Sequence, residues 1–166
     1  MLTPESFQYV HRPCGQSTLI DGPEFQAVSN PLSGIETTVC AHCGEQDDIE
    51  NFAWEGSSET IGQYYRRHLA HIPPQEKARA DRSAMFKYLI VGGAIGIAAG
   101  IATGLLTAFF STLAGLIIGA VATIAFATLG VLVGFMHFEN KIVASVIERY
   151  LGVEDARQLV ALPPNA

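Results

Sequence analysis

The sequence predicts a mainly α-helical membrane protein, built as a two-helix transmembrane hairpin with a small N-terminal β domain and a C-terminal amphipathic helix. Three observations lead to this fold class. Residues 88–136 contain no Asp, Glu, Lys, Arg or His over 49 positions, although the whole chain is 16% charged. Two Cys-containing motifs of matched spacing lie within residues 11–43, and apolar residues recur at helical spacing over residues 139–151.

The composition divides the 166 residues into four regions. Residues 1–56 form an acidic head, residues 57–87 a basic helical connector, residues 88–136 the hairpin, and residues 137–166 an amphipathic helix and tail. The 26 Asp, Glu, Lys and Arg side chains all lie outside residues 88–136, at a density close to the roughly 25% of soluble domains. A wholly soluble domain, a disordered chain and a disulfide-rich secreted scaffold are therefore excluded.

The uncharged stretch has the length of two membrane-spanning helices. One span needs about 20 apolar residues, and 49 residues in one helix would measure about 73 Å. The least apolar point near the middle is Ser111-Thr112, so we expect helices over 88–109 and 113–136 with a tight turn between them. No proline interrupts the stretch, so the backbone hydrogen bonds required in hydrocarbon can run unbroken.

The distribution of Lys and Arg predicts the orientation of the hairpin. Residues 66–87 carry six Lys or Arg against two acids, the turn is uncharged, and Lys141 and Arg149 follow the second helix. By the positive-inside rule both termini are cytoplasmic, and the chain is an integral protein of the cell or inner membrane. The first residues lack a basic segment followed by an apolar run, so we expect no signal peptide.

Glycines recur at helix-packing spacing within the predicted spans. Lipid tails are as apolar as Leu, so membrane helices associate through small residues that allow close backbone approach. Ala94, Ala98 and Ala102 add a second small row, which predicts homo-oligomers. The pattern resembles the glycine zippers of small oligomeric channels and membrane-curving hairpin proteins, and this resemblance concerns helix packing alone. The predicted packing glycines are Gly92, Gly96, Gly100, Gly104, Gly115, Gly119, Gly130 and Gly134.

Two motifs in the head predict a metal site. Each places two candidate ligands with two residues between them and follows the second with glycine: His11-Arg-Pro-Cys14-Gly15 and Cys40-Ala-His-Cys43-Gly44. A glycine there accepts the unusual backbone angles of a turn that folds its amides toward sulfur. Together the motifs supply Cys3His, a closed ligand set for structural zinc.

Residues 8–55 resemble the zinc-ribbon group of folds, with His11 where most ribbons have Cys. The resemblance implies short strands between the two motifs and a zinc ion that stabilises the fold. Asp47, Asp48 and His68 remain alternatives for the fourth ligand, whereas His42 is sterically poor. A disulfide is disfavoured because three cysteines are an odd number and a cytoplasmic head is reduced.

The charge of the head limits the classes of molecule that it can bind. Residues 1–62 hold ten acids and one base, a surface that repels nucleic-acid phosphate. We therefore expect protein contacts, either with another protein or with the basic residues 66–87 of the same chain. For those residues ordinary positive-inside topology is the favoured explanation.

Local signals place the remaining elements. Phe52–Trp54 is predicted to form a closing strand with Trp54 in the core. Residues 21–34 contain several Gly, Pro, Asn and Ser residues that predict turns. Ser57–Glu59 predict the cap of a helix to His71, and a second helix over Gln75–Met85 is expected to continue into the first span. An amphipathic helix over Glu139–Leu151, ending at Gly152, precedes a short helix over Val153–Leu162. For its apolar face we favour packing on protein, on the head or on neighbouring copies, over contact with the membrane.

No nucleophile–base pair, phosphate-binding loop or intramembrane acid is visible, so we expect no enzyme. The absence of ionisable residues from the spans also argues against proton relays, voltage sensors and ion-coupled transporters. The favoured hypothesis is an oligomeric membrane scaffold or anchor whose zinc head makes protein contacts. The alternatives are a small homo-oligomeric channel gated by its head and, more weakly, an accessory subunit of a larger membrane complex.

Overall fold

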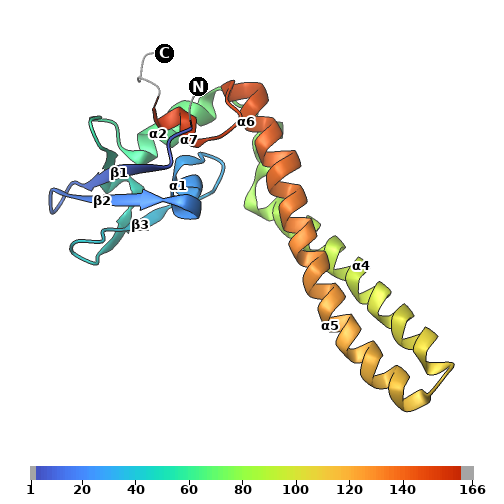
Figure 1. Ribbon diagram of the computed structural model, residues 1–166. Coiled ribbons are helices and arrows are strands. Elements are labelled where there is room, and N and C mark those ends of the chain that lie inside the picture. The colour runs from blue at the N-terminus through green and yellow to red at the C-terminus, as the bar shows by residue number, and fades with distance from the viewer. Residues whose placement is uncertain (1–2, 162–166) are drawn as a thin grey trace. The chain divides into compact units, whose positions relative to one another are not determined.

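The computed structural model describes residues 3–161, which divide into two compact units. One unit comprises residues 3–81 together with 144–161, and the other is the hairpin Arg82–Val143. The first unit is called the head from here on, and it includes most of the predicted connector as well as the acidic segment. The chain is mostly helical, with a small N-terminal sheet and two long apolar helices (Figure 1). The C-terminal residues 144–161 thus group with the N-terminal head, although the sequence presents residues 137–166 as a separate region.

The head is built on an antiparallel three-stranded sheet with the order β2-β1-β5. Its strands are β1 (Ser6–His11), β2 (Gln16–Asp21) and β5 (Phe52–Trp54). Tyr9 pairs with Thr18 on one side and with Trp54 on the other, and all three are buried. A separate hairpin of β3 (Thr37–Val39) and β4 (Gln46–Asp48) carries the second Cys motif between its strands. The predicted closing strand and the core position of Trp54 are confirmed.

A helix occupies part of the segment for which the sequence predicts only turns. α1 (Gly22–Ser29) follows β2 directly and buries Phe25 and Val28. Proline in its first turn has the backbone angle that a helix start requires, so the Asp-Gly-Pro sequence begins a helix here. The hydroxyls of Tyr64 and Tyr65 donate to the carbonyls of Ser29 and Val28, at 2.8 Å each, and hold α1 in the core.

The connector contains two helices, and their boundaries differ from those predicted. α2 (Ile61–Ala70) is capped by Thr60 in a reciprocal capping box with Gln63, rather than by Ser57–Glu59. A short 3-10 helix, η1 (Ile49–Asn51), lies earlier in the chain, just before β5. α3 (Pro74–Ala80) ends at Asp81, whose extended backbone (ψ 156°) separates it from the next helix. The expected continuous helix from Gln75 is therefore wrong, because Asp favours helix ends, where its side chain competes for backbone hydrogen bonds.

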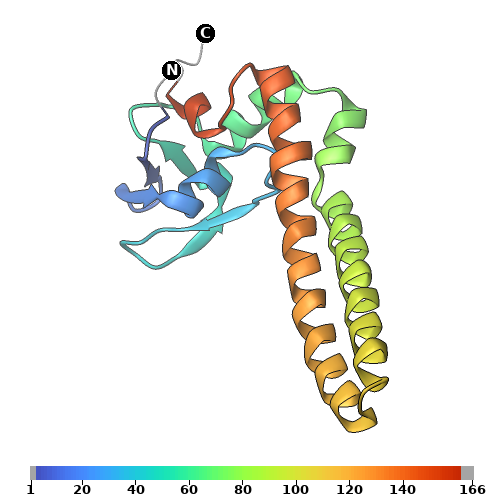
Figure 2. The same ribbon diagram turned by 45° about the vertical axis from the view of Figure 1, so that its right-hand side comes forward.

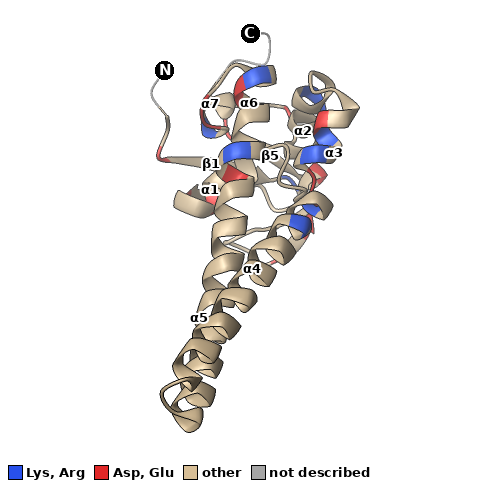
Figure 3. Cartoon of the chain, turned by 90° about the vertical axis from the view of Figure 1, so that its right-hand side faces the viewer, with Lys and Arg blue, Asp and Glu red and all other residues tan. Residues whose placement is uncertain are grey.

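The hairpin consists of α4 (Arg82–Ala108) and α5 (Thr112–His137), which lie side by side and antiparallel (Figure 2). α4 begins six residues before the predicted span, and Ser111 caps α5 by accepting a hydrogen bond from the Ala114 amide. The charges of the hairpin are confined to the end where α4 begins and α5 ends (Figure 3). Both helices are long and apolar enough to cross a membrane.

Beyond α5 the helix continues through η2 (Phe138–Val143), a π-helical segment, into α6 (Ala144–Leu151). The predicted amphipathic helix is thus the end of a continuous helix over Thr112–Leu151. It stops before Gly152 as expected, and α6 buries Val146 and Ile147 within the protein. The short final helix α7 (Arg157–Val160) contacts α1. Its predicted end at Leu162 lies outside the described residues.

Candidate metal centre

Two turns of the same backbone design present the candidate ligands. One joins β1 to β2, and the other lies between β3 and β4. The Gly15 amide donates to the His11 carbonyl at 2.7 Å, and the Gly44 amide donates to the Cys40 carbonyl at 2.8 Å. Both glycines are left-handed, with φ of 70° and 72°. This is the role predicted for the glycine that follows each ligand pair.

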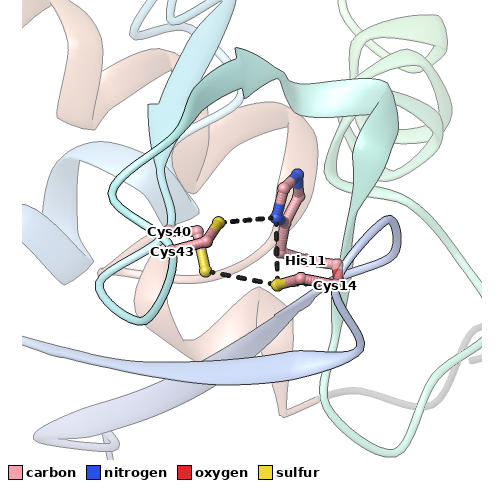
Figure 4. Close-up of side chains that lie close together, drawn as sticks. All are labelled: His11, Cys14, Cys40 and Cys43. Carbon is pink, nitrogen blue, oxygen red and sulfur yellow. Dashed lines mark hydrogen bonds between the residues drawn. The ribbon is translucent and has the colours of Figure 1, made fainter.

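The two turns bring the four predicted ligands together (Figure 4). One ligand atom from each of His11, Cys14, Cys40 and Cys43 lies within 4.8 Å of all the others. His11 Nδ1 is 3.2 Å from Cys14 Sγ and 3.5 Å from Cys43 Sγ, and the sulfurs of Cys14 and Cys40 are 3.7 Å apart. These four side chains are close enough to bind one metal ion.

The spacing of these atoms fits tetrahedral zinc. Bonds of about 2.3 Å to sulfur and about 2.0 Å to nitrogen place neighbouring sulfurs about 3.8 Å apart, and sulfur and nitrogen about 3.5 Å apart. The measured 3.7 Å between sulfurs and 3.2–3.5 Å from sulfur to nitrogen lie near those values. A disulfide needs about 2.05 Å between sulfurs, and all three cysteines are free.

The surroundings favour the thiolate form of Cys40. Its side chain is fully buried, and the backbone amides of Cys43 and His42 lower the pKa of the thiol to about 6. The Thr18 hydroxyl, which accepts from the Ala41 amide at 3.1 Å, also lies 3.9 Å from the Cys40 sulfur. Because the thiolate is the form that binds metals, the turn prepares Cys40 as a ligand.

The structure also shows which of the candidate fourth ligands lies beside the three cysteines. Asp47 Oδ2 approaches His11 at Nε2, 3.3 Å away, on the ring nitrogen that does not face the sulfurs. Asp48 accepts a hydrogen bond from the Glu50 amide and caps η1. His68 is buried elsewhere, with its ring 4.6 Å from that of Tyr64. His11 is therefore the fourth member of the cluster, and these three residues are not.

Hydrogen bonds from residues 48 and 51 fix the Asp47 carboxylate. The Asn51 side-chain amide donates to Oδ2 at 2.8 Å, and the Asp48 backbone amide donates to Oδ1 at 2.7 Å. These bonds, with a smaller contribution from His11, hold the pKa of the Asp47 carboxyl below its usual range. Sequence reasoning considered Asp47 only as a ligand, because contact with the second nitrogen of His11 depends on how two separate strands meet.

Two arginines of the basic segment 66–87 pair with acidic residues of the segment 1–62. Arg67 binds Glu59 through two hydrogen bonds of 2.8 and 2.9 Å, and Arg66 pairs with Glu50. The Thr60 hydroxyl donates to the same Glu50 carboxylate at 3.0 Å. These two arginines thus contact acidic residues of their own chain. Spacing gave no signal for it, since the partners lie 8 and 16 positions apart.

The structure places all eight predicted packing glycines where α4 meets α5. A Cβ added to Gly104 would lie 2.8 Å from the Cα of Gly119, and one added to Gly115 would lie 2.6 Å from the Cα of Ala108. At Gly96 an added Cβ would overlap the backbone of Phe126. The other five meet backbone of the facing helix in the same way: Gly92, Gly100, Gly119, Gly130 and Gly134.

Comparison of the chain with protein-family models, with curated proteins and with solved structures gives no match in any of the three.

Proposed function

We propose that this chain is a non-enzymatic membrane scaffold or anchor, whose oligomeric hairpin holds zinc-bound heads on the cytoplasmic side for protein–protein contacts. The observation that carries this proposal is that small and large residues lie on different faces of the hairpin helices. Its glycines face the partner helix, whereas large apolar side chains cover its outer surface.

The exposed surface of the hairpin supports insertion into a bilayer. Ile90, Leu105, Leu116 and Ile124 are each 64–71% exposed. Monomeric soluble proteins rarely expose apolar patches beyond a few hundred Å², and this surface continues along both helices. Residues 66–87 hold six Lys and Arg, whereas the turn at Ser111 carries no charge, and this contrast supports an orientation with both termini in the cytoplasm.

The ligand geometry supports zinc in a structural role. Three thiolates and an imidazole in a tetrahedral arrangement suit zinc, and four protein ligands leave no coordination site for a reacting water. When bound, the ion would join the β1–β2 turn to the β3–β4 hairpin, which belong to two separate sheets of the head. Binding free energy at such a site is folding free energy.

An open row of small residues supports homo-oligomers. The glycines are occupied within the hairpin, so they are not free to contact a second copy. Ala94, Ala98 and Ala102 are exposed and recur every four residues on α4. Neighbouring copies could approach closely along this row, as small residues allow in membranes.

The hydroxyl groups of the hairpin favour the scaffold over the channel. Thr103, Thr107, Thr123 and Thr128 each donate to a backbone carbonyl of their own helix. With no ionisable residue in 88–136, a lumen between copies would have a largely apolar lining. The proposal therefore expects no steady conductance.

Mass measurement of the full chain in detergent, by light scattering and native mass spectrometry, tests the proposal. We expect one discrete oligomer with one zinc per chain. Ala98→Leu should shift it toward monomer, whereas Ala99→Leu, the same substitution at an exposed position of α4 outside this row, should leave its mass unchanged. A wild-type monomer would overturn the scaffold.

Two further measurements separate function and orientation. Planar bilayers containing the protein should stay silent under voltage, tension and changes in pH, and steady single-channel steps would favour the channel instead. A cysteine introduced by Ser111→Cys should react with an impermeant maleimide added outside the cell. Labelling only after lysis would contradict the proposed orientation.

A further inference from the structure

Both nitrogens of the His11 ring are engaged, and they face different groups. Nδ1 lies 3.2 Å and 3.5 Å from the sulfurs of Cys14 and Cys43, whereas Nε2 lies 3.3 Å from Asp47 Oδ2. The His11 side chain is fully buried. No solvent therefore competes for either nitrogen, and the two contacts decide which one carries the proton.

The plane of the His11 ring is held by a third contact. His11 pairs with Phe52 across the β1–β5 ladder, and the two rings stack with centroids 4.6 Å apart and planes 21° from parallel. Phe52 is itself fully buried. Stacking fixes the plane of the imidazole. It does not determine the tautomer, because the phenyl ring of Phe52 offers no hydrogen-bond donor or acceptor to either ring nitrogen.

The position of Asp47 is fixed independently of His11. Its Oδ2 accepts from Asn51 and its Oδ1 from the Asp48 amide, at 2.8 and 2.7 Å. The Arg12 amide donates to the Asn51 carbonyl at 2.8 Å, which ties this loop to the residue that follows His11. The carboxylate is thus held rigidly beside Nε2.

We propose that Asp47 is a positioning residue of the metal site: it accepts the Nε2–H of His11 and thereby leaves the lone pair of Nδ1 available to a metal ion held among the three cysteine sulfurs. Metal-binding histidines commonly donate their second N–H to a carboxylate, and loss of that partner costs about 10–100-fold in metal affinity. This inference rests on the zinc site of the proposed function. The competing explanation is that Asp47 only stabilises the β3–β4 hairpin.

Zinc affinity of the full-length protein in detergent, measured by competition with a chromophoric chelator, tests the inference. We expect Asp47→Asn to weaken zinc binding about 10–100-fold. The matched control is Asp48→Asn, which removes the same charge one residue away without touching His11, and it should change affinity less than about 3-fold.

A second background separates positioning from general stability. In His11→Cys the fourth ligand is a thiolate that needs no tautomer, so adding Asp47→Asn to that variant should cost no more than Asp48→Asn does. An equal loss in both backgrounds would overturn the inference and leave Asp47 a structural role. Nitrogen NMR of the zinc-loaded wild type should show Nδ1 bound and Nε2 protonated, and the reverse assignment would overturn it as well.

The outcomes distinguish this inference from the proposed function. Tight zinc binding by wild type and Asp47→Asn alike would overturn the positioning role alone. A wild-type protein that binds no zinc would overturn the metal site and, with it, the inference.

Discussion

Gly15 and Gly44 occupy equivalent positions in two turns that lie 29 residues apart in the sequence. Each has a left-handed backbone, and each donates its amide to the carbonyl four residues earlier. A Cβ at either position would meet no atom within 4 Å, so backbone conformation alone determines the cost of replacing them. The two ligand pairs therefore depend on glycine for geometry rather than for space.

Gly44→Ala should lower the stability of the zinc-bound head by about 1–2 kcal/mol, because a left-handed residue with a Cβ costs that much. It should also weaken zinc binding, since the Cys40–Cys43 turn distorts. Denaturation in detergent can be followed by fluorescence of Trp54, the only tryptophan and a core residue of the head. Gly34→Ala has a similar backbone cost (φ 66°) outside the ligand turns, so unchanged zinc affinity there is the control.

Removing the metal should unfold the head and spare the hairpin. Chelation, or Cys40→Ser, leaves the β1–β2 turn and the β3–β4 hairpin without their shared ion, and small metal domains of this kind unfold without it. Trp54 fluorescence should shift to that of an exposed indole, while far-UV circular dichroism keeps the signal of the two long helices. A head that keeps its buried Trp54 after complete chelation would contradict the structural role of the metal.

Gly96→Leu should disrupt the hairpin itself. An added Cβ meets the Phe126 carbonyl and lies 2.8 Å from the Cα of Ala127, and backbone cannot yield as a side chain can. Overpacking costs typically about 1–3 kcal/mol, and here we expect at least that. Thermal unfolding in detergent, followed by circular dichroism, measures the effect. The exposed Ala98 provides the control, because Ala98→Leu should change assembly and leave the hairpin transition in place.

The two arginine–glutamate pairs of α2 should differ in strength. Each pair makes two hydrogen bonds, but Arg67 and Glu59 are 29% and 18% exposed, whereas Arg66 and Glu50 are 64% and 42% exposed. Exposed pairs contribute about 0–1 kcal/mol. A double-mutant cycle to alanine should give a larger coupling energy for Arg67–Glu59, and equal couplings would show that burial is unimportant here.

His68 should make the head sensitive to acid. Burial, with a smaller contribution from Arg67, lowers the pKa of its imidazole from 6.5 to about 4. Between these values the unfolded chain binds a proton that the folded head does not. The contribution of neutral His68 to the free energy of unfolding is thus fully present above pH 6.5. It is lost as the pH falls to about 4, by about 3 kcal/mol in all.

His68→Gln tests this assignment, because glutamine does not titrate. Trp54-monitored unfolding from pH 7.5 to 4 should show a shallower loss of stability than wild type. All other ionisable side chains are the same in the two proteins, so the difference between the two curves isolates His68. Superimposable slopes would show that His68 does not contribute to the acid sensitivity.

Composition and spacing determined the features that depend on neighbours in the chain. The uncharged residues 88–136 specify two helices because hydrocarbon length and backbone hydrogen bonding need no knowledge of other segments. The matched motifs ending at Gly15 and Gly44 specify two ligand turns for the same reason. The helix boundaries were less accurate, since Thr60 rather than Ser57–Glu59 caps α2 and Asp81 interrupts the helix expected from Gln75.

The tertiary structure decided what depends on residues far apart in sequence. It placed His11, rather than Asp47, Asp48 or His68, in the cluster with the three cysteines. It also placed the carboxylate of Asp47, 36 positions from His11 in the sequence, against Nε2 of that residue. It joined α7 to α1 and assigned the glycines of the hairpin to the contact between α4 and α5. Local sequence sets which conformations a segment can adopt, but the partner of a buried group is set by packing, which brings distant segments to the same place.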